Sequence, residues 1–176
     1  MKTKCSKCKR DAKVSLGYGE SDYCDKHFLE FIEKRIRKDL RISQRLSTKK
    51  EYFIKKSPSS EYALAKYYLG RIFNGHLNIS STKRKGRIEI IPRFLEGEAS
   101  DYIESFAQDR DFSAKLNPLR TVLFAEAAEI CRILKIPHKK AESSELMEKI
   151  AEKHPETKFS VIRFMRSMEE KIKKEK

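Results

Sequence analysis

Two pairs of metal-binding residue types restrict what the N-terminus of this chain can fold into. Cys5 and Cys8 form one pair, Cys24 and His27 form the other, and together they read C-x2-C-x15-C-x2-H. A structural zinc site takes four such ligands in a tetrahedron, and each x2 turn brings its pair to one side of the ion. We therefore expect residues 1–27 to form a zinc-binding module whose closed site does no chemistry. A disulfide framework fits less well, because three cysteines are an odd number and a histidine completes the set.

The net charge is the second constraint. The 176 residues include 40 Lys and Arg against 26 Asp and Glu, which gives a formal charge of +14. Self-repulsion of that size opposes compaction, so a polyanionic partner is indicated. The surplus is concentrated between residues 34 and 56, where ten basic residues are opposed only by Asp39 and Glu51. A Lys/Glu-rich surface of the thermophilic kind would explain the number of charges but not their imbalance.

A basic amphipathic helix is predicted directly after the module, over residues 28–46. Its apolar positions recur at helical spacing at Phe28, Ile32, Ile36 and Leu40. Another face carries a basic stripe made of Lys34, Arg37, Lys38, Arg41 and Arg45. Such a helix can bury one face and follow a phosphate backbone with the other. A solvated face is the alternative interpretation, and the charges do not distinguish RNA from DNA.

The rest of the chain alternates strand-like and helix-like segments. Strands or extended pieces are expected at 51–54, 87–91 and 116–119, and helices at 61–73, 94–108, 122–134, 143–152 and 158–173. Residues 74–87 show neither pattern and are expected to form an exposed loop. The alternation predicts an α/β fold with a mainly parallel sheet. Neither a membrane span nor a signal peptide is recognisable, so a soluble cytoplasmic protein is expected.

Several stretches resemble one protein family. They are the zinc module running into the helical segment 35–41, Asn117-Pro118-Leu119-Arg120 followed by 134–137, and the segment 154–163. All are similar to segments of the archaeal and eukaryotic tRNA 2-thiolation proteins, which are PP-loop ATP-pyrophosphatases acting on uridine. The resemblance implies an adenine nucleotide alpha hydrolase-like α/β fold and tRNA as a partner.

The chain departs from this family at its SGGKDS phosphate loop. After the strand at 51–54 the corresponding residues are Ser57, Pro58, Ser59 and Ser60. Glycines in such a loop let backbone N–H groups close on the phosphates of ATP, whereas proline lacks an N–H and serine adds a side chain. ATP chemistry is therefore expected to be lost.

The family's internal cysteines are also missing. Those cysteines bind an iron–sulfur cluster or relay sulfur, and one cysteine without partners cannot hold a cluster. The one thiol outside the module, Cys131, lies in an alanine-rich helical segment and is expected to be a small buried apolar residue. The histidines outside the module, His76, His138 and His154, are expected to be solvated.

A chain that keeps the module and scaffold without the catalytic parts resembles the non-catalytic cytoplasmic tRNA 2-thiolation protein 2 type. We expect a zinc module at 1–27, a basic connecting helix at 28–48 and a degenerate PP-loop-like α/β domain at 49–176. The expected function is that of a zinc-containing tRNA-binding subunit that supports uridine 2-thiolation by a partner PP-loop enzyme, without ATP or an iron–sulfur cluster of its own. Two alternatives stay open: a minimal ATP-dependent tRNA thiolase, and a zinc nucleic-acid-binding protein unrelated to thiolation.

Overall fold

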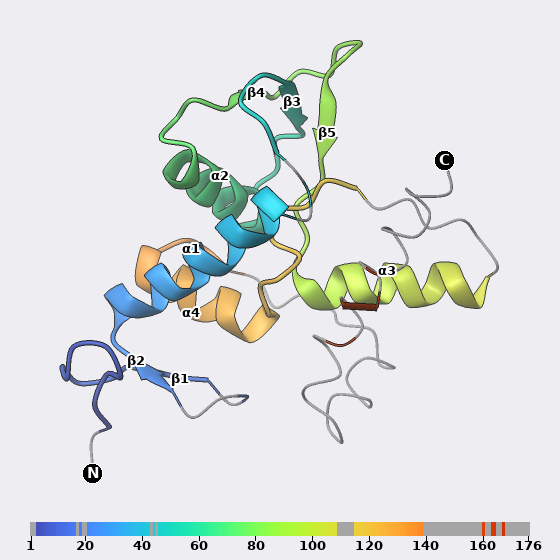
Figure 1. Cartoon of the computed structure of the whole chain (residues 1–176). Coiled ribbons are helices and arrows are strands. Elements are labelled where there is room, and N and C mark those ends of the chain that lie inside the picture. The colour runs from blue at the N-terminus through green and yellow to red at the C-terminus, as the bar shows by residue number, and fades with distance from the viewer. Residues whose placement is uncertain are drawn as a thin grey trace.

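Two small sheets and a set of helices make up the part of the chain that the computed structural model describes, which is residues 3–16, 18, 21–42, 44, 46–108, 115–138, 160, 163, 164 and 167. The elements follow in the order β1 (Val14–Ser15), β2 (Asp22–Tyr23), α1 (Asp25–Ile42), β3 (Glu51–Ile54), α2 (Ser60–Ile72), β4 (Asn78–Ser80), β5 (Ile88–Ile90), α3 (Leu95–Ala107) and α4 (Phe124–Leu134) (Figure 1). The helices predicted at 143–152 and 158–173 fall outside the described residues, apart from four helical positions in the second.

The N-terminal strands form a hairpin within the predicted zinc module. β1 pairs antiparallel with β2, with Val14 opposite Tyr23, and Tyr18 lies in the turn between them. The Tyr23 ring stacks on Phe31 of α1 at 5.2 Å. This contact joins the hairpin to the helix that follows it.

Helix α1 buries the predicted apolar face. Phe28, Ile32, Ile36 and Leu40 are all fully buried, because their i, i+4 spacing keeps them on one side of the helix. Each such side chain stabilises the fold by about 1.5–3 kcal/mol relative to an exposed one. The helix begins and ends a few residues earlier than predicted, with an acidic residue, Asp25, in the first turn.

The second sheet is parallel throughout and has the strand order β4-β3-β5. β3 has the predicted bounds, and α2 carries the chain from β3 to the neighbouring parallel strand β4. The prediction of an exposed loop over 74–87 is wrong at Asn78–Ser80, which form β4. Three residues are too few to show an alternating pattern, so this strand depends on pairing with β3 and not on its own sequence. The predicted α/β class with a parallel sheet is confirmed.

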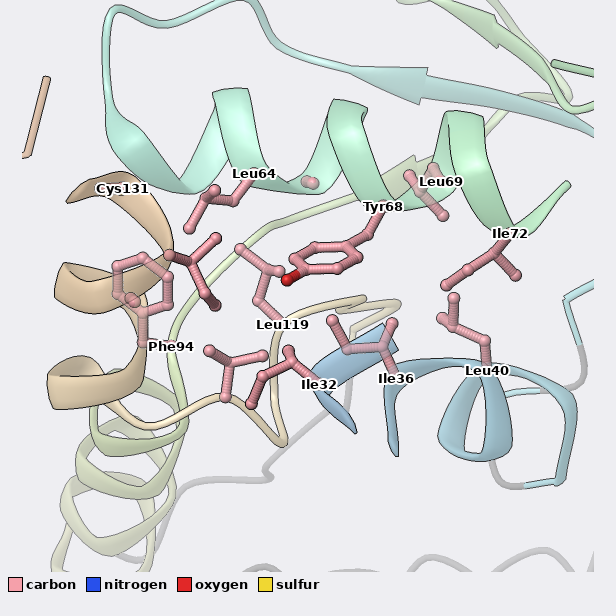
Figure 2. Packing of buried hydrophobic residues seen from close by; sticks show 14 of the residues in the cluster. Ile32, Ile36, Leu40, Leu64, Tyr68, Leu69, Ile72, Phe94, Leu119 and Cys131 are labelled. Atoms are coloured by element: carbon pink, nitrogen blue, oxygen red, sulfur yellow. The ribbon is translucent and has the colours of Figure 1, made fainter. Parts of the chain in front are cut away.

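The hydrophobic core lies where α1, α2 and α4 meet (Figure 2). Ile32, Ile36 and Leu40 of α1 face the α2 residues in the close-up. The α2 side of this contact is made of Leu64, Tyr68, Leu69 and Ile72. Leu119, from the loop before α4, reaches into the same cluster. One continuous core therefore joins the basic helix to the sheet-bearing part of the chain.

A buried polar network fixes the loop 117–120 against α1. The guanidinium of Arg120 donates to Asp39, with 3.0 Å between Arg120 Nε and Asp39 Oδ2. Gln44 bridges the two segments, donating at 2.6 Å to the Asn117 carbonyl oxygen and accepting at 2.8 Å from the Asn117 N–H. Asp39 belongs to one of the stretches that resemble the thiolation proteins and Asn117 and Arg120 to another, so the two stretches touch in the fold.

Candidate functional site

The four predicted metal ligands come from three local structures. Cys5 and Cys8 lie on a turn, where the Lys9 N–H donates to the Cys5 carbonyl oxygen at 3.0 Å and Lys9 takes the left-handed conformation (φ 59°). Cys24 follows β2 directly, and His27 lies in the first turn of α1. The hairpin and the start of the helix therefore bring residues 22 positions apart in the sequence into contact.

The spacing of the ligand atoms fits a single tetrahedral ion. The distances are 3.7 Å from Cys8 Sγ to Cys24 Sγ, 3.5 Å from Cys5 Sγ to His27 Nδ1 and 3.4 Å from Cys24 Sγ to His27 Nδ1. Zinc bonds of about 2.3 Å to sulfur and about 2.0 Å to nitrogen put two sulfurs about 3.8 Å apart and a sulfur and a nitrogen about 3.5 Å apart. A disulfide needs sulfurs about 2.05 Å apart, so the thiols are free. The set can bind a metal, and its four protein ligands leave no open coordination position.

The protonation behaviour of the thiols is consistent with a cation-binding set. Burial raises the pKa of Cys5, but backbone hydrogen bonds at Cys24, Lys7 and Cys8 outweigh it and leave the pKa at about 6. A backbone hydrogen bond at Arg10 lowers the pKa of Cys8, yet burial and the adjacent thiols raise it more, so the net shift is upward. Neighbouring thiolates resist joint ionisation unless a cation neutralises them, and the thiolate is the ligand form.

Groups outside the ligand set hold the module in place. The Nε2 atom of His27 faces Glu30 Oε2 at 3.9 Å, so the ring nitrogen opposite the ligand atom has a carboxylate beside it. Tyr18 donates to the buried carboxylate of Glu126 on α4, and Arg35 on α1 pairs with that same carboxylate. The module, α1 and α4 therefore share one buried charge network.

The basic stripe lies along α1, and its members differ in exposure. Lys34, Lys38 and Arg41 are exposed to solvent. Arg37 is half-buried and donates to Glu33 at 2.5 Å, so part of its charge is already neutralised. Arg45 lies outside the described residues. The described stripe is therefore a row of three open cations beside one paired arginine.

The loop after β3 lies between a strand and a helix, as a phosphate loop does. Two of the backbone N–H groups there, however, donate to serine side chains of the loop itself. The Ser59 N–H donates to Ser57 Oγ at 3.2 Å, and the Tyr62 N–H donates to Ser59 Oγ at 3.3 Å. Ser59 is thus an ordinary N-cap of α2. Pro58 contributes no N–H. Glu61 adds a carboxylate to the first turn, where an anionic ligand would lie.

One contact at this loop is missed by sequence reasoning. His138 is half-buried and not solvated as predicted, with Nδ1 3.1 Å from Ser60 Oγ and its ring 4.8 Å from that of Phe124. Lys135 brings it there, because its left-handed conformation (φ 55°) ends α4 and turns the chain back. His76 is exposed as expected, and His154 lies outside the described residues.

Cys131 is buried in α4, as expected. Burial, with a further contribution from Glu61, raises the pKa of its thiol to about 11. A thiol of this kind is protonated at neutral pH and is a poor nucleophile.

None of the helices in the described part of the chain has the length and hydropathy needed to cross a bilayer. No protein-family model matches the sequence, and no curated protein matches it either. Among solved structures, the U34-tRNA thiolase NcsA from Methanococcus maripaludis, determined with its [4Fe-4S] cluster, is similar to 94% of this chain and 86% of its own, with a TM-score of 0.71 at 11% identity. The chain therefore shares the fold of this U34-tRNA thiolase.

Proposed function

We propose that this protein is a non-catalytic, metal-containing tRNA-binding subunit that supports 2-thiolation of tRNA uridine by a partner PP-loop enzyme. The proposal starts from the fold shared with a tRNA thiolase across nearly the whole chain. Within that fold, one observation carries it: the loop after β3 uses its backbone donors on its own serine side chains. Phosphate binding at such a loop needs those donors to point at the ligand.

Charge at the same loop argues against ATP as well. An N-terminal helix turn attracts anions through its free N–H groups and dipole. Here the carboxylate of Glu61 stands in that turn, and the Ser60 hydroxyl is in contact with His138. ATP would have to displace the contact between Ser60 and His138 and would be repelled by the like charge of Glu61. The loop therefore supports a scaffold role more than a nucleotide site.

The cysteine content supports zinc as the metal of the N-terminal set. The whole chain has four cysteines, and three of them are in the set with His27. Iron–sulfur clusters of the [4Fe-4S] type are held by cysteine thiolates, commonly four, whereas Cys3His is an ordinary structural zinc set. The separations of 3.4 to 3.7 Å suit one ion better than a cluster that spreads its ligands over several irons. Zinc here would hold the module folded and present it, because no ligand position is open.

The tRNA part of the proposal depends on the cations of α1. Lys34, Lys38 and Arg41 are exposed, while the opposite side of the helix is buried in the core. A rigid row of cations can contact successive phosphates and set the position of an RNA while another chain performs the chemistry.

Calorimetry and reconstitution test the proposal. Titration with Mg·ATP should show no binding, whereas tRNA should bind with strong salt dependence. Adding the protein to an active PP-loop thiolase and its sulfur donor should raise thiolation of tRNA, and it should do so equally after Ser57→Ala/Ser60→Ala. Tight magnesium-dependent ATP binding, or thiolation by this chain alone, would establish the minimal thiolase instead. Failure to bind tRNA would contradict the proposal altogether.

A further inference from the structure

A basic turn between β4 and β5 has no role in the function proposed above. It presents Lys83, Arg84 and Lys85, all of which are exposed. Figure 1 shows this connection projecting beyond the sheet, away from the helices. Three adjacent cations at the tip of a projecting turn form a compact positive surface that is separate from the α1 stripe.

The turn has a defined shape. The Arg87 N–H donates to the Arg84 carbonyl oxygen at 3.2 Å, and Gly86 has φ +89°, which together make a type II turn with glycine at the position that needs a positive φ. The Arg87 side chain donates to the Thr82 carbonyl oxygen at 3.0 Å and closes the base of the turn. The cations are therefore carried on an ordered backbone, which lowers the entropic cost of binding.

In the sheet next to this turn, one acidic side chain is paired and two more lysines are exposed. Glu51 of β3 is paired with Arg87 at 2.9 Å, so its carboxylate is neutralised. β3 and β5 are parallel, with Tyr52 opposite Ile88, so the exposed Lys49 and Lys50, which precede β3, lie at the same amino edge of the sheet as the turn that precedes β5. Glu89, exposed on β5, is the next acidic residue along the chain after the turn.

We propose that this surface, Lys83, Arg84 and Lys85 with Lys49 and Lys50, is a second phosphate-binding site that contacts the backbone of the same tRNA. The inference rests on the tRNA-binding role proposed above. Five cations, with Glu51 paired and Glu89 the next acid along β5, suit a polyanion better than a protein surface of mixed charge. Lysine and arginine at a projecting tip contact phosphates without reading bases, so the site positions the RNA. Two separated contacts, on α1 and on the turn, fix an orientation that one contact alone does not.

Salt-dependent tRNA binding tests the site. The variant Lys83→Gln/Arg84→Gln/Lys85→Gln removes three charges and leaves the turn backbone unchanged. The matched control Lys26→Gln/Lys66→Gln/Lys135→Gln removes three exposed lysines from α1, α2 and the end of α4. For the turn variant, the slope of log affinity against log salt should fall by about 2, at about 0.7–0.9 per lost phosphate contact. The control should keep the slope of the wild type.

The outcomes separate this inference from the proposed function. One outcome would contradict only the second site. In it, the wild type binds tRNA and Lys34→Gln/Lys38→Gln/Arg41→Gln weakens that binding, but the turn variant keeps the wild-type slope of log affinity against log salt. The proposed function would then stand. If the turn variant keeps its tRNA affinity and instead loses association with an acidic partner protein, the surface is a protein interface and the inference is overturned. If the wild type binds no tRNA at any salt concentration, both are wrong.

Discussion

At the scale of single residues, His27 is the sharpest probe of the metal site. His27→Ala leaves three ligands, whereas His27→Cys restores a fourth soft ligand at the same backbone position. The wild type and His27→Cys should each retain about one zinc per chain after dialysis against a weak chelator, and His27→Ala should lose most of it. Elemental analysis by plasma mass spectrometry gives the metal content, and circular dichroism gives the melting temperature.

Two results would contradict this expectation. If His27→Ala kept its metal under the same dialysis, the histidine would not be a ligand. If the purified wild type contained several irons and sulfide per chain in place of zinc, the set would hold a cluster. Cys131 does not confuse the measurement, because its buried thiol stays protonated until the pH approaches its pKa of about 11.

At the scale of the elements, Glu33 ties α1 to α2. Its carboxylate accepts from Arg71 Nε at 2.8 Å, across the two helices, and from Arg37 on its own helix. Burial raises the pKa of Glu33, but these two arginines outweigh it and hold the pKa below its ordinary value of 4.5. A depressed carboxyl pKa stabilises the fold above that ordinary value, and the stabilisation is lost as the pH falls through the folded-state pKa.

Glu33→Gln should therefore lower the free energy of unfolding at pH 7 by about 1 kcal/mol, since the pairs are partly exposed. At pH 3 the difference from the wild type should shrink towards zero. Urea unfolding at both pH values measures this, and Glu104→Gln, an exposed glutamate on α3, is the matched control, which should stay within about 0.5 kcal/mol of the wild type. A loss of equal size at both pH values would mean that the substitution acts through packing.

Elements that carry their own pattern are predictable from this sequence, and elements made by tertiary contacts are not. The apolar face of α1 and the strand at 51–54 are confirmed. Both could be predicted because the spacing of apolar residues along the sequence shows which side chains will be buried. β4 is missed because its three residues depend on pairing with β3. The contact of His138 with Ser60 joins residues 78 apart, and no local pattern predicts it.

The same distinction applies to the candidate site. The C-x2-C and C-x2-H spacing predicts the grouping of the four ligands, because each pair is local and one hairpin joins them. The sequence shows Asp39 and Arg120 only as two charged residues in segments that resemble a family, and it does not indicate that they are buried together. Their pairing across 81 residues needs the fold.

At the scale of the whole molecule, the charge of +14 acts on stability and on binding in opposite directions. Repulsion among exposed cations opposes the compact state, and salt screens it, since the Debye length falls from about 10 Å at 0.1 M to about 3 Å at 1 M. Buried pairs such as Asp39–Arg120 are screened much less. The melting temperature should therefore rise by a few degrees between about 0.05 and 0.5 M NaCl, while tRNA affinity falls steeply over the same range.

Thermal unfolding followed by circular dichroism, with tRNA binding measured in the same buffers, tests this opposition. Sodium sulfate at matched ionic strength separates screening from ion exclusion, because exclusion would make the sulfate shift larger. A melting temperature that falls with NaCl would mean that attractive surface pairs outweigh the repulsion, and the excess charge would then need no polyanion to explain it. A parallel rise of stability and affinity with salt would exclude phosphate contacts as the basis of binding. The cations of α1 and of the β4–β5 turn would then be a solvated surface.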